Sequence, residues 1–351
     1  MKAAVWYAKG DVRIEEVAEP PSPPTGWVKV KVHACGICGS DLHEYATGPV
    51  LICADDPHPL TGTTSPLILG HEFSGEVVER GEFVGNVEIG ARVAGMGGQI
   101  CGECYYCEKM ELNRCVNGAY LGFHYDGAFA EYVNVPAYSL FTLPENVSSQ
   151  AGALVEPFAV GLHAVRRGSV SEGDTVVVLG AGPVGLATLQ TAVAEGAERV
   201  FVLEMANSRK ELALQMGATA VFDPSEVDPL VEIQKLTDGL GADVAIECIG
   251  SEKTAPLAIA LVRKGGTVVM AGIFSKESKI NFLDVALTEK QIIGSFGYFA
   301  EFPEVIEWFA AGKLNPQPLL TGTIALDDIV EKGFDELLSG QSSDIKIIVK
   351  P

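Results

Sequence analysis

The stretch Thr175–Gly185 (TVVVLGAGPVG) decides the fold of this chain. Its first five residues are a β-branched threonine and four aliphatic residues, which predicts a short buried strand. The next six residues have the spacing GxGxxG, and a helix is expected near Val184–Gly196. A glycine-rich turn between a buried strand and a helix is typical of the start of a βαβ unit.

The same alternation of apolar strand and helix continues beyond this turn. A second helix is expected near Ser208–Met216. Further strands are expected at Arg199–Leu203, Ala220–Phe222, Asp243–Glu247, Thr267–Met270 and Gln291–Ser295. Strands that are separated by helices form parallel sheets. The pattern therefore predicts an α/β fold with a Rossmann-type, doubly wound parallel sheet over residues 158–297.

The glycine motif in this context predicts a dinucleotide site. Gly180, Gly182 and Gly185 allow backbone N–H groups at the helix N-terminus to approach a pyrophosphate. Glu204 lies 19 residues after Gly185 at the end of the next strand, where it can bind a ribose 2′-hydroxyl and favour NAD. Two alternatives stay open. The glycines can serve packing alone, or Arg209 and Lys210 can hold the 2′-phosphate of NADP.

The first half of the chain is instead rich in short β-like runs separated by Gly and Pro. Examples are Val28–His33, Phe73–Glu79 and Phe129–Val135. We expect a β-rich domain over residues 1–157, completed by residues 298–351, because the strand-like Ile345–Val349 suits a return to it. Two domains agree with a length of 351 residues.

Composition narrows the possible partners. The formal net charge is −21, and phosphate binding needs Lys and Arg, so nucleic acid is not expected as a partner. No signal peptide and no apolar run long enough to span a membrane are visible. We expect a cytoplasmic protein, in which the eight cysteines stay reduced.

Four of these cysteines form a compact group. Cys101, Cys104, Cys107 and Cys115 have the spacing C-x2-C-x2-C-x7-C. Four thiolates can surround one zinc ion tetrahedrally, with no position left for chemistry, which predicts a structural site. An iron–sulfur cluster is the alternative, although Val116 stands where such motifs usually have Pro.

A second metal site is predicted from residues that are scattered through the β-rich half. Cys38, His71 and Glu156 are a Cys, a His and a carboxylate, the donor types that hold catalytic zinc with one open position. Cys35 and Cys38 also form a CxxC, which leaves a thiol redox role as an alternative. Cys35, Cys53 and Cys248 are most simply small apolar residues.

Five motifs together resemble those of a known family. They are Gly36–His43 (GICGSDLH), Gly70-His71-Glu72, the cysteine quartet, Glu156-Pro157 and the GxGxxG turn. In this order they resemble the medium-chain zinc alcohol dehydrogenases over essentially the whole chain. The resemblance implies a GroES-like catalytic domain that carries two zinc ions, and a Rossmann domain that binds NAD, with a cleft between them.

The resemblance also implies roles for individual residues. Cys38, His71 and Glu156 would bind the catalytic zinc, and Glu72 would be an alternate or outer ligand. Asp41 would orient a ligand. Because Glu156 replaces the usual second Cys, the chain is similar to the polyol branch, which contains sorbitol, threonine and butanediol dehydrogenases. In that branch the Glu binds zinc directly or through water.

Within the branch, Leu42–Pro49, Asp55–Gly75 and the extra loop between Gly48 and Pro66 most resemble the butanediol dehydrogenases. The implied reaction interconverts a secondary alcohol or diol, such as (R,R)-2,3-butanediol, with its ketone, such as acetoin. Sorbitol, xylitol and threonine remain alternative substrates, and a non-enzymatic role is disfavoured by the intact ligands.

The family's proton path would run from the substrate to Ser40 and then to His43, whose type of side chain titrates near neutral pH. Ser40 equally suits a helix N-cap. The family also implies a homodimer or homotetramer formed through the edge of the Rossmann sheet. The residues lining the dinucleotide would be Gly180, Gly182, Val184, Gly185, Glu204, Arg209, Ala271, Gly272, Ile273, Ser295, Phe296 and Gly297.

Overall fold

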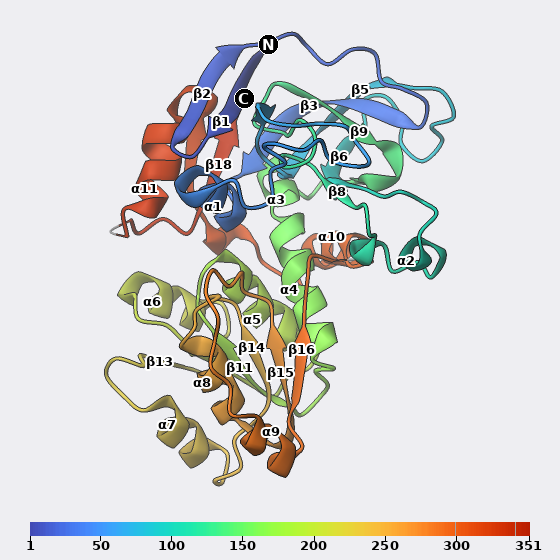
Figure 1. The fold of residues 1–351 in the computed structure, drawn as a ribbon. Coiled ribbons are helices and arrows are strands. Elements are labelled where there is room, and N and C mark those ends of the chain that lie inside the picture. The colour runs from blue at the N-terminus through green and yellow to red at the C-terminus, as the bar shows by residue number, and fades with distance from the viewer. Residues whose placement is uncertain (299, 341) are drawn as a thin grey trace. The chain divides into compact units, whose positions relative to one another are not determined.

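The computed structural model describes residues 1–298, 300–340 and 342–351. The chain forms two compact units. The first contains residues 1–156, 302–310 and 320–351, and the second contains residues 157–301 and 311–319. Figure 1 colours both along the chain, and each is described by itself below.

The first unit is rich in β-structure. Its strands are β1 (Lys2–Ala8), β2 (Asp11–Glu16), β3 (Trp27–Gly36), β4 (Leu67–Ile68), β5 (Glu72–Arg80), β6 (Arg92–Gly95), β7 (Gly98–Gln99), β8 (Ala119–Tyr120), β9 (Tyr132–Pro136), β10 (Leu140–Thr142), β17 (Leu320–Ala325) and β18 (Lys346–Lys350). Its helices are α1 (Gly39–Thr47), α2 (Tyr105–Glu108), α3 (Ser149–Ala153), α10 (Phe302–Ala311) and α11 (Asp335–Leu338).

The main sheet of this unit joins segments that are far apart in sequence. Its order is β10-β6-β5-β3-β18-β17, and β9 also pairs with β3. Strand β3 is central because its alternate residues Val28, Val30 and Val32 are buried in the core. The late strand β18 pairs antiparallel with the end of β3 and parallel with β17, so residues 346–350 belong to the same sheet as the first half.

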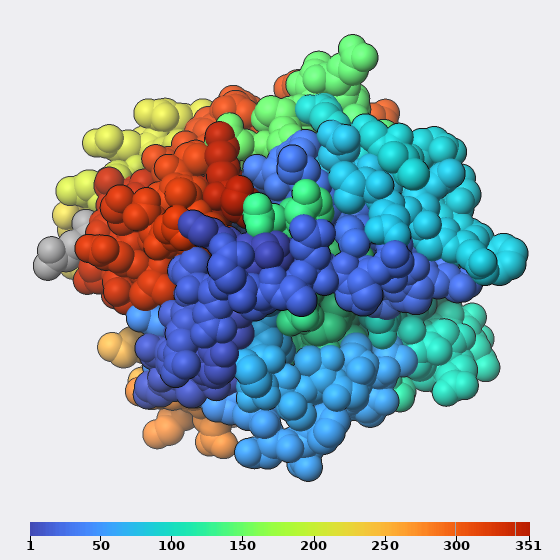
Figure 2. Space-filling view, turned by 90° about the horizontal axis from the view of Figure 1, so that it is seen from above, coloured from blue at the N-terminus to red at the C-terminus, as the bar shows by residue number. Residues whose placement is uncertain are grey.

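Figure 2 shows one face of this unit. The dark blue residues of the first strands cross the middle of the face, with orange and red C-terminal residues on one side and lighter blue residues on the other. This agrees with the pairing of β1 with β2 and β4 in a smaller antiparallel sheet. The N-terminal strands therefore cover the core of the first unit.

The helix α4 (Val155–Arg167) begins in the first unit and continues into the second. The second unit has strands β11 (Thr175–Leu179), β12 (Arg199–Leu203), β13 (Ala220–Phe222), β14 (Ala242–Glu247), β15 (Val262–Met270) and β16 (Gln291–Gly294). Its helices are α5 (Pro183–Ala194), α6 (Asn207–Gln215), α7 (Pro229–Leu236), α8 (Thr254–Leu261) and α9 (Phe282–Thr288).

These strands form one parallel sheet in the order β13-β12-β11-β14-β15-β16. The predicted doubly wound α/β architecture is confirmed. Both faces of β11 are covered, because Val177 and Leu179 pack in a core with α7 and α8 while the alternating Val176 and Val178 are equally buried. The order of strands reverses between β11 and β14, which is where such sheets bind ligands.

The division of the chain differs in detail from the expected ranges of 1–157 with 298–351 and of 158–297. Residues 311–319 group with the second unit. The reason is a pair of hydrogen bonds, in which Gln190 donates to the carbonyl of Asn315 at 2.8 Å and Asn315 N–H donates back at 2.8 Å. A side-chain amide on α5 thus holds this returning segment.

Among the helices of the described residues, none is long and apolar enough to cross a membrane.

Candidate metal and dinucleotide sites

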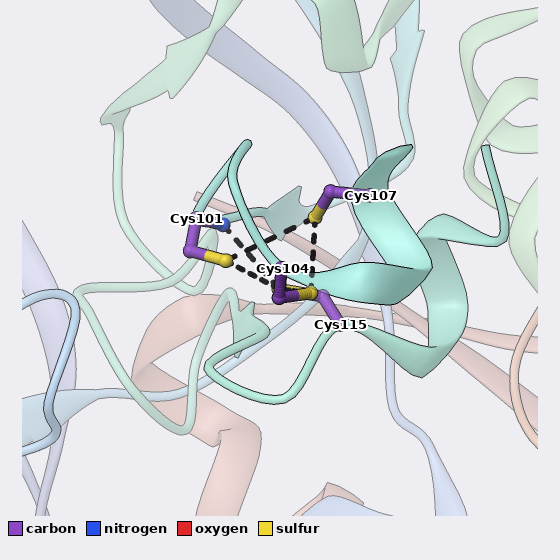
Figure 3. A group of neighbouring side chains, drawn as sticks. All are labelled: Cys101, Cys104, Cys107 and Cys115. Carbon is purple, nitrogen blue, oxygen red and sulfur yellow. Dashed lines mark hydrogen bonds between the residues drawn. The ribbon is translucent and has the colours of Figure 1, made fainter. Parts of the chain in front are cut away.

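The cysteine quartet lies on a small lobe of the first unit, around β7, α2 and β8. Figure 3 shows the four side chains pointing toward one another. Neighbouring sulfur atoms are 3.4 to 4.0 Å apart, as measured for Cys101–Cys115, Cys104–Cys107, Cys101–Cys107 and Cys104–Cys115. Four ligands at about 2.3 Å from one tetrahedral ion would lie about 3.8 Å apart, so the spacing fits a single zinc ion.

The same distances decide between the predicted alternatives. All the cysteines are free thiols, and the sulfurs are too far apart for disulfides. The four sulfurs are also too close together for a polynuclear iron cluster, in which the four thiolates are divided among two or more irons.

Backbone hydrogen bonds in the lobe favour the thiolate form of Cys104. Hydrogen bonds from Val116 and Cys107 lower the pKa of Cys104 to about 6. Burial instead raises the pKa of Cys107 to about 12. Because zinc binds the thiolate form, the ion itself must displace the proton of Cys107.

The second group is Cys38, His71 and Glu72. One ligand atom of each lies within 4.8 Å of the others. Cys38 is the residue before α1, His71 is the residue before β5, and Glu72 is the first residue of β5. The ends of β3 and β5 meet because Gly36 is paired with Glu72 in the sheet. Sheet register, rather than sequence proximity, therefore brings these three donors together.

Asp41 supports this group in two ways. One oxygen accepts a hydrogen bond from Cys38 N–H at 2.9 Å, and the other lies 3.5 Å from Nδ1 of His71. That second oxygen and His71 Nδ1 are buried and lack a hydrogen-bond partner in the described structure. A buried carboxylate facing the Nδ1 side of an imidazole is the arrangement found behind zinc-binding histidines. The donor set therefore fits zinc.

The charges around His71 also favour a cation at this site. Burial lowers the pKa of its imidazole, but Asp41 and Cys38 raise it by more, so the pKa lies well above its usual value. A site that stabilises a positive charge on this imidazole is one that also suits a cation bound to it.

Glu72 is held by a lysine that the sequence did not single out. Lys346 donates to both carboxylate oxygens at 2.7 Å, and both side chains are 1% exposed. Burial lowers the pKa of Lys346, whereas Glu72, Cys38 and Glu156 raise it, and the net shift is upward. Glu156 lies in the first turn of α4, outside the group of three close donors.

Ser40 and His43 lie on α1, next to this group. They are three residues apart on the helix and so share one face. Ser40 Oγ is 3.4 Å from Nε2 of His71. The alternative that Ser40 is the N-cap is wrong, because Cys38 occupies that position and Ser40 lies inside the first turn.

The extra loop between Gly48 and Pro66 is fixed at several points. The buried carboxylate of Glu44 accepts N–H groups of Val50, Leu51 and Ile52. The ring of His58 stacks on that of His124, with centroids 4.3 Å apart, and His124 Nε2 lies 3.0 Å from the carbonyl of Leu51. The loop is therefore an ordered part of the first unit, attached to the helix that carries Ser40 and His43.

In the second unit, the glycine turn follows β11 as predicted. Gly180 has φ +97°, a conformation that favours glycine. A Cβ atom at Gly185 would collide with the carbonyl oxygen of Gly180, whereas one at Gly182 would meet nothing within 4 Å. Gly182 is the N-cap of α5. The turn thus leaves open space at the N-terminus of a helix, where a pyrophosphate can bind.

Glu204 lies at the carboxyl end of β12, beside this turn. Its carboxylate accepts a hydrogen bond from Ala181 N–H at 2.9 Å and others from the backbone of Met205 and Ala206. Arg209 and Lys210 are the two cations considered for binding a 2′-phosphate. The ammonium of Lys210 forms an ion pair with Asp223 at 2.8 Å. Arg209 is half-buried on α6.

The remaining predicted dinucleotide residues follow β15 and β16 at the same edge of the sheet. They are Ala271, Gly272, Ile273, Ser295, Phe296 and Gly297. The sequence missed Glu247, a fully buried carboxylate at the end of β14. It accepts N–H groups of Ile249 and Gly250 and the hydroxyl of Thr254, and its carbonyl accepts from Ala271 and Gly272. Glu247 therefore organises the loops at this edge.

Comparison with known proteins identifies the family of the chain. Residues 24–145 match the alcohol dehydrogenase GroES-like domain, and residues 183–311 match the zinc-binding dehydrogenase family. The (R,R)-butanediol dehydrogenase of Bacillus subtilis is 42% identical over 100% of both chains. A sorbitol dehydrogenase of the same organism is 35% identical over 100% of this chain and 97% of its own.

Solved structures give the same result. The crystal structure of 2R,3R-butanediol dehydrogenase from B. subtilis has a TM-score of 0.93, with 40% identity, covering 100% of this chain and 99% of the other. A zinc-binding dehydrogenase from Sinorhizobium meliloti bound to NADP has a TM-score of 0.89, with 32% identity and the same coverage. An alcohol dehydrogenase from Escherichia coli complexed with NADH has a TM-score of 0.90, with 30% identity and the same coverage.

Fold and sites together define a zinc-type oxidoreductase that uses a nicotinamide dinucleotide. The chain belongs to the zinc-dependent medium-chain alcohol dehydrogenase family, among polyol and alcohol dehydrogenases.

Proposed function

We propose that this chain is an NAD-dependent secondary alcohol dehydrogenase that interconverts (R,R)-2,3-butanediol and acetoin. The observation that carries the proposal is the close group of Cys38, His71 and Glu72, with Asp41 behind the imidazole. The choice of butanediol rests on the identity of 42% with a butanediol dehydrogenase, against 35% with a sorbitol dehydrogenase, and on the ordered loop between Gly48 and Pro66.

Each residue has a distinct task in this proposal. Cys38 and His71 would hold the catalytic zinc, with Glu156 as a direct or water-mediated ligand and Glu72 beside it. Asp41 keeps the imidazole oriented. Zinc, when bound, supplies a Lewis acid that makes an alcohol proton easier to lose. The quartet Cys101, Cys104, Cys107 and Cys115 would hold a second, structural zinc.

The chain's own side chains then move the proton. Ser40, beside His71, is placed to accept it from the alcohol and pass it toward His43 on the same face of α1. The alcohol loses one hydride and one proton in total, so the products are the ketone, NADH and H⁺. His43 is half-buried and can exchange the proton with water.

NAD is the proposed dinucleotide because Glu204 places a negative charge beside the glycine turn and Lys210 is engaged by Asp223. A carboxylate there repels a 2′-phosphate. The residues after β11, β12, β15 and β16 would line the bound dinucleotide. We also propose a cytoplasmic location, since the cysteines are free thiols.

The test is the initial rate of NADH formation with (R,R)-butanediol, measured beside sorbitol, xylitol and threonine, and with NAD against NADP. We expect a clear preference for butanediol and for NAD. Preference for sorbitol would reassign the substrate within the family, and preference for NADP would overturn the role of Glu204.

The variant Ser40→Ala tests the proton path. We expect kcat to fall by about 100-fold, the lower range for removal of a proton-transfer group, with the zinc content unchanged. The surface variant Ser22→Ala is the matched control. An unchanged kcat in Ser40→Ala would exclude this serine from the path.

A further inference from the structure

Lys346 makes contacts that the proposed reaction does not explain. Its ammonium group donates to the carbonyl of Ile37 at 2.8 Å and to both oxygens of Glu72 at 2.7 Å. A lysine ammonium has three protons, and these three bonds use them all. The side chain is 1% exposed, so water does not compete for these bonds.

The carboxylate of Glu72 is enclosed as tightly as the ammonium group of Lys346. Glu72 is 1% exposed, and a Cβ atom at Gly36 would collide with its Oε2. Gly36 is paired with Glu72 on one side and with Ile348 of β18 on the other. The glycine therefore leaves the space in which the carboxylate meets the lysine of the neighbouring strand.

Yet Glu72 also reaches the metal group. One of its oxygens lies within 4.8 Å of the donor atoms of Cys38 and His71. The carboxylate thus has two possible cationic partners, the ammonium of Lys346 and an ion between Cys38 and His71. A carboxylate oxygen shared with an ammonium donates less charge to a metal, because both compete for the same lone pairs.

We propose that Lys346 is a positioning residue that holds Glu72 out of the coordination sphere of the catalytic zinc and so keeps a position open for substrate. The inference rests on the proposed function, because it assumes zinc at Cys38 and His71. Without the ammonium, the buried carboxylate loses its counter-charge, and the nearby ion becomes its best remaining partner.

The charge balance explains why this matters for catalysis. Zinc held by one thiolate and a neutral imidazole would keep one positive charge if Glu156 binds through water, and none if Glu156 binds directly. In either case Glu72 as a further ligand would lower the charge of the site by one. A less positive ion polarises an alcohol less. Lys346 therefore preserves the electrophilic character of the site by pairing with the carboxylate of Glu72.

The experiment compares Lys346→Met with Lys346→Arg, which keeps the charge. The catalytic ion is exchanged for Co²⁺, whose visible absorption reports the number and type of its ligands. We expect a changed spectrum in Lys346→Met and recovery of the original spectrum in Lys346→Arg. Release of zinc to a chelator should slow in Lys346→Met, because Glu72 would then add a ligand. We expect a change of about 10-fold, the lower end of the range for groups behind metal ligands.

A second background makes the test specific to Glu72. In Glu72→Gln, the change Lys346→Met should alter neither the spectrum nor the rate of zinc release, because no carboxylate remains to move. If Lys346→Met is too unstable to purify, Lys346→Gln removes the charge while keeping a polar group. An unaltered cobalt spectrum in a folded neutral variant, or faster zinc release, would overturn the proposal that Lys346 holds Glu72 away from the ion.

Metal counts separate this result from the proposed function. We expect two zinc ions per chain, falling to one in Cys38→Ser. If Cys38→Ser loses no metal, the proposed function fails, and with it the basis for this inference. If the metal is lost there but Lys346→Met leaves the site unchanged, only the inference about Lys346 fails.

Discussion

Asp41 illustrates how one side chain serves a metal group at two points. It satisfies the N–H of Cys38 at the start of α1 and faces the ring of His71. The same buried carboxylate therefore bonds to one proposed ligand and lies against the other, inside the core of the unit. Catalytic groups that are held by buried hydrogen bonds stay within the narrow geometry that chemistry requires.

His124 gives a prediction about acid stability. Burial, with a further contribution from His58, lowers the pKa of its imidazole to about 4, against about 6.5 in an unfolded chain. Below pH 6.5 the unfolded chain therefore binds a proton that the folded chain does not. The contribution of His124 to stability should fall from about pH 6.5 to about pH 4 and then level off, with a loss of up to about 3 kcal/mol.

The measurement is urea unfolding of zinc-loaded protein between pH 7 and pH 4.5. His124→Gln should be less stable at pH 7, because it loses bonds to Tyr120 and Leu51, but its stability should depend less on pH. His33→Gln is the control and should keep the original slope. Equal slopes for His124→Gln and the unaltered protein would contradict the prediction.

Residues in local motifs could be predicted from the sequence, and those with distant partners could not. The glycine turn and the cysteine quartet are contiguous, so spacing alone identifies them. Lys346 and Glu72 are 274 residues apart, and only the pairing of β18 with β3 brings them together. Glu247 was missed because most of its partners are backbone N–H groups, which leave no trace in side-chain patterns.

At the level of elements, the lobe around β7, α2 and β8 depends on its metal. Its strands and helix are two to four residues long, too short to be stable alone. Cys104→Ser should therefore lose one zinc ion per chain and lower the melting temperature by roughly 5 °C or more, given about 2–4 °C per kcal/mol for domains of this size.

Cys53→Ser, which changes a half-buried cysteine outside both metal groups, is the control. It should retain two zinc ions and its melting temperature. Retention of two ions by Cys104→Ser would mean that the quartet does not bind zinc as one site.

The elements themselves were predicted best where the chain alternates strands and helices. Strands β11, β12 and β13 have the bounds that the sequence predicted, since each is a short, mostly apolar run. Strand β15 begins at Val262 rather than Thr267, because its pairing with β14 shifts register and admits polar residues such as Arg263. Helix α4 was not foreseen as the element that carries Glu156.

For the whole molecule, we propose a homo-oligomer formed through the edge of the parallel sheet. Strand β16 is the last strand in the order of that sheet. Helix α9 comes just before β16 in the sequence and has no buried residue. Its apolar side chains Phe282, Leu283 and Leu287 are 66 to 75% exposed. An apolar surface of this kind is typical of a protein interface. We expect Leu287→Asp to convert a dimer or tetramer to smaller species.

Sedimentation velocity measures this change, with Phe83→Asp, an exposed residue of the first unit, as the control. Because each chain carries a net charge of −21, repulsion between copies should make association stronger as salt is added. A monomeric unaltered protein, or an oligomer untouched by Leu287→Asp, would exclude this surface.

The position of β18 in the sheet has a consequence for synthesis on the ribosome. Cys38, His71 and Glu72 emerge early, but the strand that carries Lys346 emerges after the whole second unit has been made. At 5–20 residues per second, the delay is on the order of tens of seconds. During that time the nascent chain presents a thiol, an imidazole and an unneutralised carboxylate, so metal capture can precede the arrival of the lysine. The late strand would then displace the carboxylate from the ion, making activation the last step of folding.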